Sequence, residues 1–187
     1  MATLFLTGAC GNINPDYSVR QELFGEKLGG EIMRGLGRLE FIAQPAFWVE
    51  SREVAMPGRE HPEFSEKEIA LEWPQALEMS KGSFYEMKKS KKPSYPYFFT
   101  GIRIGNDFAM VTNPDELFCE FGLGIKKQSP LKYTMVVEQT NGAYGYVPTA
   151  QAFNDGGYET WFGEHSQLTT RAGDIIEKES VGILNDL

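Results

Sequence analysis

The sequence predicts an α/β fold in which mixed β-sheet layers are flanked by helices. The chain begins with an apolar run, a loop rich in Gly and Asn, and a helical pattern, which is the order that opens an α/β layer. Farther on, two strand-like runs are joined by the turn Gly105-Asn106-Asp107. Hydrophobic residues make up 41% of the 187 residues and charged residues 24%, as in ordinary globular proteins.

Strands and helices are predicted along the whole chain. They are a strand at 4–7, a helix at 18–36, a strand at 46–55, a helix from 65 onward, strands at 98–104 and 108–112, a helix at 115–127, a strand at 132–139 and a helix at 172–182. The sequence contains no internal repeat and no low-complexity linker, so we predict one mixed α/β unit.

Capping patterns and alternation predict the elements of the first half. Residues 4–7 are apolar and bounded by glycine, which favours a buried strand. Ser18 and Gln21 have the spacing of a capping box, and apolar residues recur after them at helical intervals. Residues 46–55 alternate and end at a Pro-Gly pair, as a strand does. A second capping box at 65–68 begins the next helix.

Turn residues predict the boundaries in the second half. The polar, Pro-rich stretch 88–96 is expected to be an exposed loop. Asn113-Pro114 precedes the helix predicted at 115–127, because proline suits the first turn of a helix. The Asn141-Gly142 turn follows the strand at 132–139 and begins a long loop.

The charge balance argues against nucleic acid as a partner. The chain has 26 acidic and 18 basic residues, so its net charge of -8 repels a phosphate backbone. The one basic cluster, at 88–92, has no interleaved aromatic residues, and we interpret it as a solvated loop or helix end. We therefore expect no nucleic-acid partner.

The compartment stays undetermined at this stage. No apolar run approaches the roughly 20 residues that span a bilayer. The N-terminal MATLFLTG has neither the basic region nor the cleavage-site pattern of a signal peptide. Cys10 and Cys119 are interpreted as two buried thiols or one disulfide, and neither choice fixes the compartment. Cytoplasmic and secreted locations stay open, as does the oligomeric state.

Three clusters contain residue types that can perform chemistry. They are 8–15 (GACGNINP), 113–116 (NPDE), and 141–149 with 156–159 (NGAYGYVPT and GGYE). The glycine-rich loop could bind an anion or be a tight strand-to-helix turn. Glu116 could be an acid in a first helical turn, and Tyr146 and Tyr158 could be half-buried aromatic residues.

In the order and spacing of these clusters, the sequence resembles the neutral/alkaline, non-lysosomal ceramidases over most of its length. That family has a G-x-x-G-[DN]-x-[SN]-P loop, here 8–15, and a P-x-E motif at a helix start, here 114–116. An Asn-containing loop ending in Tyr follows, here 141–146, and a Tyr-Glu pair comes 12 residues later, here 158–159. The resemblance implies that residues 1–187 are the C-terminal half of a ceramidase-like catalytic domain, and thus an incomplete domain.

The resemblance implies a zinc-dependent hydrolase that acts in sphingolipid metabolism and cleaves the acyl amide bond of N-acylsphingosine with metal-activated water. It assigns zinc to Glu116 and Tyr146, together with two histidines from the earlier part of the domain. Tyr158 is the tyrosine that helps to polarise the substrate carbonyl. Gly11 and Asn12 belong to the loop that is expected to contact the substrate or an anion.

One departure from the family pattern concerns the glycine-rich loop. The active-site serine of the family falls on Asn14, which offers an amide in place of a hydroxyl and cannot form an acyl-enzyme. If the protein is catalytic, metal-bound water must attack directly, and Asn14 orients water or substrate. The substrate of such a divergent relative need not be a ceramide.

The other departure concerns the histidines. Both zinc histidines of the family precede the glycine-rich loop, whereas His61 and His165 follow it here. We interpret both as surface residues, with a pocket-lining role for His165 as the alternative. We therefore expect the chain to be a fragment whose N-terminal half, in cis or as a second chain, supplies the histidines. A domain cut in this way should leave an uncovered sheet face that is prone to association.

Two other functions stay open. The chain could be a non-catalytic, ceramidase-like binding module, as Asn14 and the missing histidines suggest. It could also be part of a hydrolase that acts on a different, polar substrate. Four aromatic residues could line an acyl groove, although we expect core packing for most of them. They are Phe98, Phe99, Phe153 and Trp161.

Overall fold

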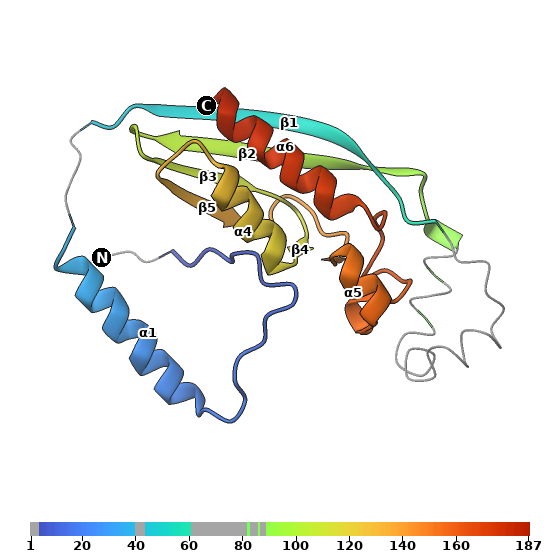
Figure 1. Cartoon of the computed structure of the whole chain (residues 1–187), viewed down its shortest axis with the longest axis horizontal. Coiled ribbons are helices and arrows are strands. Elements are labelled where there is room, and N and C mark those ends of the chain that lie inside the picture. Colours follow the sequence, from blue (N-terminus) through green and yellow to red (C-terminus); the bar gives the residue numbers. More distant parts are fainter. Residues whose placement is uncertain (1–3, 40–43, 61–81, 83–85, 87–88) are drawn as a thin grey trace.

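The computed structural model describes the chain except for residues 1–3, 40–43, 61–81, 83–85 and 87–88. The predicted helix from 65 onward and His61 lie outside the described residues. The rest forms a mixed β-sheet with helices, which confirms the predicted α/β class (Figure 1). In the described part, no helix is long and apolar enough to cross a membrane.

A four-stranded sheet organises the fold. Its strands lie in the order β1-β2-β3-β5, with β5 parallel to β3 and the other neighbours antiparallel. The bounds are β1 Phe47–Pro57, β2 Ser94–Ile104, β3 Phe108–Thr112 and β5 Tyr133–Val137. The hairpin predicted around Gly105 is confirmed, and Gly105 has the positive φ of 66° that the tight turn needs.

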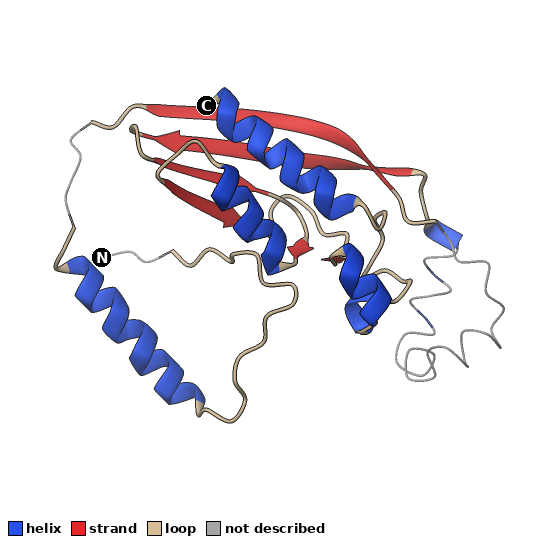
Figure 2. Cartoon of the chain, in the orientation of Figure 1, coloured by secondary structure: helices blue, strands red, loops and turns tan. Residues whose placement is uncertain are grey.

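Two helices cover one face of this sheet. Helix α6 (Ala172–Asp186) contacts β1, β2 and β3, and α4 (Cys119–Gln128) packs beside it over β5 (Figure 2). Gly101 of β2 faces Ile183 of α6 and Leu187 just after this helix, so the residues of β2 that share the side of Gly101 point toward the helices. Alternate residues of the strands on this side, including Tyr97, Phe99 and Val111, form the core with Ile125 and Ile183.

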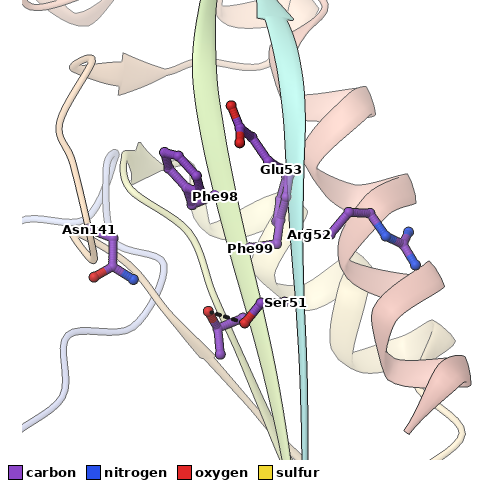
Figure 3. Close-up of a pocket in the computed structure, with 7 residues that line it drawn as sticks. Ser51, Arg52, Glu53, Phe98, Phe99 and Asn141 are labelled. Carbon is purple, nitrogen blue, oxygen red and sulfur yellow. Dashed lines mark hydrogen bonds between the residues drawn. The ribbon is translucent and has the colours of Figure 1, made fainter.

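The opposite face of the sheet is exposed and apolar. The strand register places several apolar side chains on this face, each of them 37–60% exposed. They are Phe47, Val49, Phe98, Tyr133 and Met135. Figure 3 shows Arg52 pointing toward α6 and Phe98 projecting from the other side of the strands. A cavity of about 560 Å³ lies on this face, where Asn141 of the loop after β5 approaches the β1–β2 pair. We call this surface the open sheet face.

A second, small sheet follows the main one. Strands β4 (Glu116–Leu117) and β6 (Tyr146–Val147) pair in parallel. Helix α5 (Ala150–Asp155) comes after β6, inside the loop that the sequence predicts from the Asn141-Gly142 turn through Gly157, and the short 3-10 helix η1 (Tyr158–Thr160) follows that loop. The prediction of a continuous loop is therefore wrong, and the prediction of helix at 172–182 is confirmed.

The helix predicted at 115–127 begins later than its Pro-Asp-Glu motif suggests. Residues 116–117 form β4, and the helix α4 starts only at Cys119. Glu116 is therefore a strand residue and not an acid in a first helical turn. The reason is tertiary, because the backbone N–H of Glu116 donates to Gly145 O (3.1 Å) on the neighbouring segment. The loop predicted at 88–96 also gives way to strand, since β2 begins at Ser94.

The N-terminal segment lies apart from the core. Helix α1 (Gln21–Leu36) buries none of its residues and stands away from the sheet in Figure 1. Its predicted capping box is wrong, because the Ser18 hydroxyl donates to Asp16 (2.6 Å) instead. Residues 4–7 do not form a strand, although Thr7 O accepts one backbone hydrogen bond from Glu138 (2.9 Å).

Candidate active site at the β4–β6 pair

Four distant segments of the backbone meet at the small sheet. On one side of β4, the N–H of Gly11 donates to Leu117 O (2.9 Å). On the other side, β4 pairs with β6. Beyond β6, the N–H of Tyr146 donates to His165 O (2.7 Å). The glycine-rich loop, Glu116 and the tyrosine segments, which the sequence singled out separately, are thus fixed beside one another by main-chain bonds.

Three of the predicted site residues come together here. Glu116 and Tyr146 are directly paired residues of the parallel strands. The Tyr158 hydroxyl donates to the Tyr146 hydroxyl (3.4 Å), and the two rings meet edge to face with centroids 5.4 Å apart. Tyr158 is 45% exposed, so part of its side chain can contact a ligand. One carboxylate and two phenols therefore form a single cluster of oxygen atoms.

The environment of this cluster keeps the Tyr146 phenol neutral and disfavours the ionised form of the acid beside it. Burial raises the pKa of Tyr146 well above its ordinary value, and the neighbouring Tyr158 hydroxyl and Glu116 carboxylate raise it further. Burial also raises the pKa of Asp115, the residue before Glu116, to about 7. A cation placed among these groups would be stabilised by the surrounding acidic oxygens.

Glu138 is a buried acid that sequence reasoning missed. Its side chain is 3% exposed and accepts hydrogen bonds from the Leu117 N–H (2.8 Å) and from the Cys10 thiol (3.1 Å). Burial raises the pKa of Glu138, and burial and Glu138 together raise the pKa of Cys10 to about 11. Glu138 thus joins the glycine-rich loop to β4 through one carboxylate. Cys10 and Cys119 are both free thiols, so the disulfide alternative is wrong.

Gly11 and Asn12 attach the glycine-rich loop to the start of α4. A Cβ on Gly11 would overlap the backbone carbonyl of Glu116, so only glycine lets the loop approach β4 this closely. The Asn12 side chain accepts from the Cys119 N–H (2.8 Å) and donates to Glu120 (2.9 Å). Asn12 therefore caps the N-terminus of α4 from a distant loop. Phe118, which occupies the N-cap position of this helix, forms no side-chain capping hydrogen bond.

Replacing Asn12 by alanine is expected to lower the free energy of unfolding by about 1 kcal/mol, because the first N–H group of α4 loses its acceptor. Urea denaturation followed by circular dichroism measures this change. Asn14→Ala is the matched control, since Asn14 is exposed and makes no side-chain hydrogen bond within the described residues. Equal effects of the two substitutions would contradict the capping role of Asn12.

Asn14 stays separate from the oxygen cluster in its contacts. It is exposed, and within the described residues its side chain makes no hydrogen bond to Glu116, Tyr146 or Tyr158. Its assignment as a residue that orients water or substrate therefore remains a prediction.

His165 is not the surface residue that the sequence suggested. It is half-buried, and its Nε2 atom is buried with no hydrogen-bond partner in the described part of the chain. Burial and the nearby Arg59 lower its pKa, while the Tyr158 backbone acts in the opposite direction. His165 thus lies behind the two tyrosines, where its own backbone pairs with Tyr146.

A cavity of about 560 Å³ adjoins the cluster on the side of α5. Phe118, two positions after Glu116, lines it together with Glu159, the neighbour of Tyr158. The remaining lining residues are mostly polar or acidic: Asn12, Glu120, Thr149, Gln151, Ala152, Asp155 and Gly156. We call this the acidic cavity. Of the aromatic residues considered for an acyl groove, Phe99 is core and Phe98 belongs to the open sheet face, and none lines this cavity.

The donor set fits part of a zinc site. A carboxylate and a phenol on paired strands supply two oxygen ligands, whereas zinc sites in proteins use three or four donors. Among the residues that the structure describes, no group of three or more His, Cys, Asp or Glu side chains is arranged to hold a metal ion. Glu116 and Tyr146 would therefore need further donors.

Comparisons with known proteins point to one fold. No protein-family model matches the chain, and a search of curated proteins finds no match. The crystal structure of neutral ceramidase from Pseudomonas aeruginosa superposes with a TM-score of 0.59 at 14% identity, covering 96% of this chain and 36% of that chain. A ceramidase complexed with C2 is also similar, with a TM-score of 0.42 at 15% identity over 50% of this chain and 15% of that chain. The chain has a ceramidase-like fold and spans about a third of the length of the first of these proteins.

Proposed function

We propose that this chain forms part of a zinc-dependent hydrolase that cleaves an acyl amide bond. In this proposal Glu116 and Tyr146 bind zinc together with two histidines from an N-terminal half of the same domain, joined in cis or present as a second chain. The observation that carries it is the convergence of Glu116, Tyr146 and Tyr158 at the β4–β6 pair. The ceramidase-like fold of the chain is consistent with this function.

In this proposal each of the three side chains has a role. The Glu116 carboxylate and the Tyr146 oxygen can both bind a cation, because they extend from paired positions of β4 and β6. Tyr158, whose hydroxyl is 3.4 Å from that of Tyr146 and whose side chain is 45% exposed, can donate a hydrogen bond to a substrate carbonyl. Bound zinc would supply Lewis acidity and lower the pKa of a coordinated water.

The open sheet face supports the need for a complementary half. Large apolar side chains such as Phe47 (60% exposed) and Tyr133 (55% exposed) occupy neighbouring strands there, a surface that soluble proteins ordinarily cover. A segment packed on this face would bury them and could bring further metal ligands to the protein. The exposed apolar face is consistent with the proposal of a divided domain, and the segment that would cover it is part of the proposal.

The proposal is tested by measuring zinc in the chain joined to, or co-expressed with, its N-terminal half. We expect about one zinc per complex, with each of Glu116→Ala and Tyr146→Phe weakening zinc affinity about 100-fold or more, since even outer-shell substitutions cost 10–100-fold. Elemental analysis after gel filtration gives the stoichiometry, and competition with a chelator gives the affinity.

Tyr17→Phe is the matched control, because Tyr17 is 83% exposed and belongs neither to the oxygen cluster nor to the open sheet face. It should leave zinc unchanged. Full zinc affinity in both Glu116→Ala and Tyr146→Phe would exclude these residues as ligands. Zinc binding without any hydrolysis of acyl amides or esters would favour the alternative, a non-catalytic ceramidase-like binding module.

A polar substrate is the second candidate, and the acidic cavity favours it. Glu120, Asp155 and Glu159 line this cavity beside Tyr158, whereas a groove for a long acyl chain is expected to be lined by apolar residues. Comparing hydrolysis of a long-chain ceramide with that of a short N-acyl amine separates the candidates. Faster turnover of the ceramide would count against the polar substrate.

A further inference from the structure

Arg59 is a half-buried cation that sequence reasoning did not single out. It follows β1, and its backbone N–H donates to Gln167 O (2.8 Å). Its guanidinium lies over the Phe153 ring, with Cζ 4.9 Å from the ring centroid. Burial lowers the pKa of Arg59 to about 10, so the side chain stays charged near neutral pH. A charge that is partly withdrawn from water needs strong hydrogen-bond partners, and the positions of these partners show which segments Arg59 connects.

The three groups that accept hydrogen bonds from the Arg59 guanidinium lie within residues 160–166, the segment that continues from Tyr158. Nη2 donates to Thr160 O (2.7 Å), and Nη1 donates to Trp161 O (3.2 Å) and to Ser166 Oγ (2.9 Å). Thr160 ends the 3-10 helix that begins at Tyr158. Ser166 follows His165, whose carbonyl accepts from Tyr146. The planar guanidinium of Arg59 therefore joins the two ends of residues 160–166.

We infer that Arg59 is a positioning residue, which holds Tyr158 edge to face against Tyr146. The 3-10 helix is only one turn long, and Tyr158 is 45% exposed, so local packing alone constrains the ring weakly. The hydrogen bonds to the carbonyls of Thr160 and Trp161 hold the 3-10 helix that contains Tyr158. The hydrogen bond to Ser166 holds the neighbouring residue His165 in place, whose carbonyl accepts from Tyr146. Arg59 does not touch the phenols; it acts through the backbone. The inference deepens the proposed function, because Tyr158 is the proposed donor to the substrate.

The test reads the geometry of the two rings in the metal-free 187-residue chain, so it is independent of zinc binding and hydrolysis. With ring-labelled tyrosine, the edge-to-face contact gives a nuclear Overhauser effect between Tyr146 and Tyr158, assigned with Tyr146→Phe and Tyr158→Phe. Arg59→Lys keeps the charge but loses the planar guanidinium, and it is expected to weaken this signal about two-fold or more. The Tyr97–Phe99 contact in the core, with centroids 4.9 Å apart, is the internal reference and should stay unchanged.

Arg52→Lys is the matched control. Arg52 is also a partly buried arginine of the β1 region, but it pairs with Glu179 and Asp186 of α6, away from the tyrosines. It should leave the Tyr146–Tyr158 signal intact. If Arg59→Lys does not fold, Ser166→Ala removes one acceptor at little steric cost and should weaken the same signal partially. If Arg59→Lys folds and leaves the Tyr146–Tyr158 signal unchanged, the inference is wrong. If Arg59→Lys does not fold, an unchanged signal in Ser166→Ala overturns the inference instead. A loss of signal in Arg52→Lys as large as that in Arg59→Lys would also overturn it.

Discussion

Replacing Gly145 by alanine is expected to lower the free energy of unfolding by about 3 kcal/mol. Gly145 has a φ of 93°, which costs an L-residue roughly 1–2 kcal/mol. A Cβ at this position would also overlap the backbone of His165, well inside the 3.0 Å that real Cβ contacts respect. Such overpacking costs about 1–3 kcal/mol, since backbone on both sides must move. Urea denaturation measures the sum.

Gly156→Ala separates the two causes. Gly156 also has a positive φ, 84°, but a Cβ there meets nothing within 4 Å. It should cost only the conformational part, roughly 1–3 kcal/mol, because a positive φ combined with its ψ of -171° is a backbone conformation essentially restricted to glycine. The difference between the two variants therefore reports the close approach of residues 145 and 165. If the variants lose equal stability, the tight packing behind Tyr146 is not as the structure describes it.

Replacing Glu138 by alanine is expected to cost about 3 kcal/mol. The Leu117 N–H, which donates to Glu138 at 2.8 Å, would be left buried without a partner, at a cost of roughly 1–3 kcal/mol. The Cys10 thiol and backbone would lose their acceptor too. Removing a side chain that is 3% exposed also leaves a cavity, which adds to the cost. Chemical denaturation at pH 7 measures the loss.

Glu138→Gln is the informative companion, because it keeps an acceptor oxygen for Leu117 and removes a charge that burial disfavours. It should be about as stable as the parent chain or more stable. Glu26→Ala, at an exposed position of α1, serves as a surface control and should change stability by less than about 0.5 kcal/mol. Equal losses in Glu138→Ala and Glu138→Gln would show that the charge, and not the hydrogen bonds, joins the loop to β4.

Both substitutions address how the candidate site is held together. Gly145 and Glu138 lie on opposite sides of the β4–β6 pair, the former against His165 and the latter between Leu117 and Cys10. The oxygen cluster of Glu116 and Tyr146 therefore depends on residues with no part in binding. A loss of stability in either variant is expected to loosen the pairing of the two candidate ligands.

Part of the fold could be predicted from local patterns. Alternation and the Gly105 turn predicted the hairpin, and helical spacing predicted α1 and α6, because these signals come from neighbouring residues. Residues 116–117 could not be predicted in this way. A proline lead-in and an acid resemble a helix start, yet pairing with β6, whose residues lie 30 positions farther along, makes this segment a strand.

The sequence by itself determined the α/β class, the spacing of Glu116, Tyr146 and Tyr158, and the resemblance that singled them out together. Only the tertiary structure showed that Glu138 bonds Cys10 across 128 positions, that Asn12 caps a helix 107 positions away, and that Arg59 holds the tyrosine segment. The physical reason is the distance along the chain over which each kind of interaction acts. Periodicity and turn chemistry act over a few residues, whereas a buried polar side chain takes its partner from whatever the fold brings within hydrogen-bond distance.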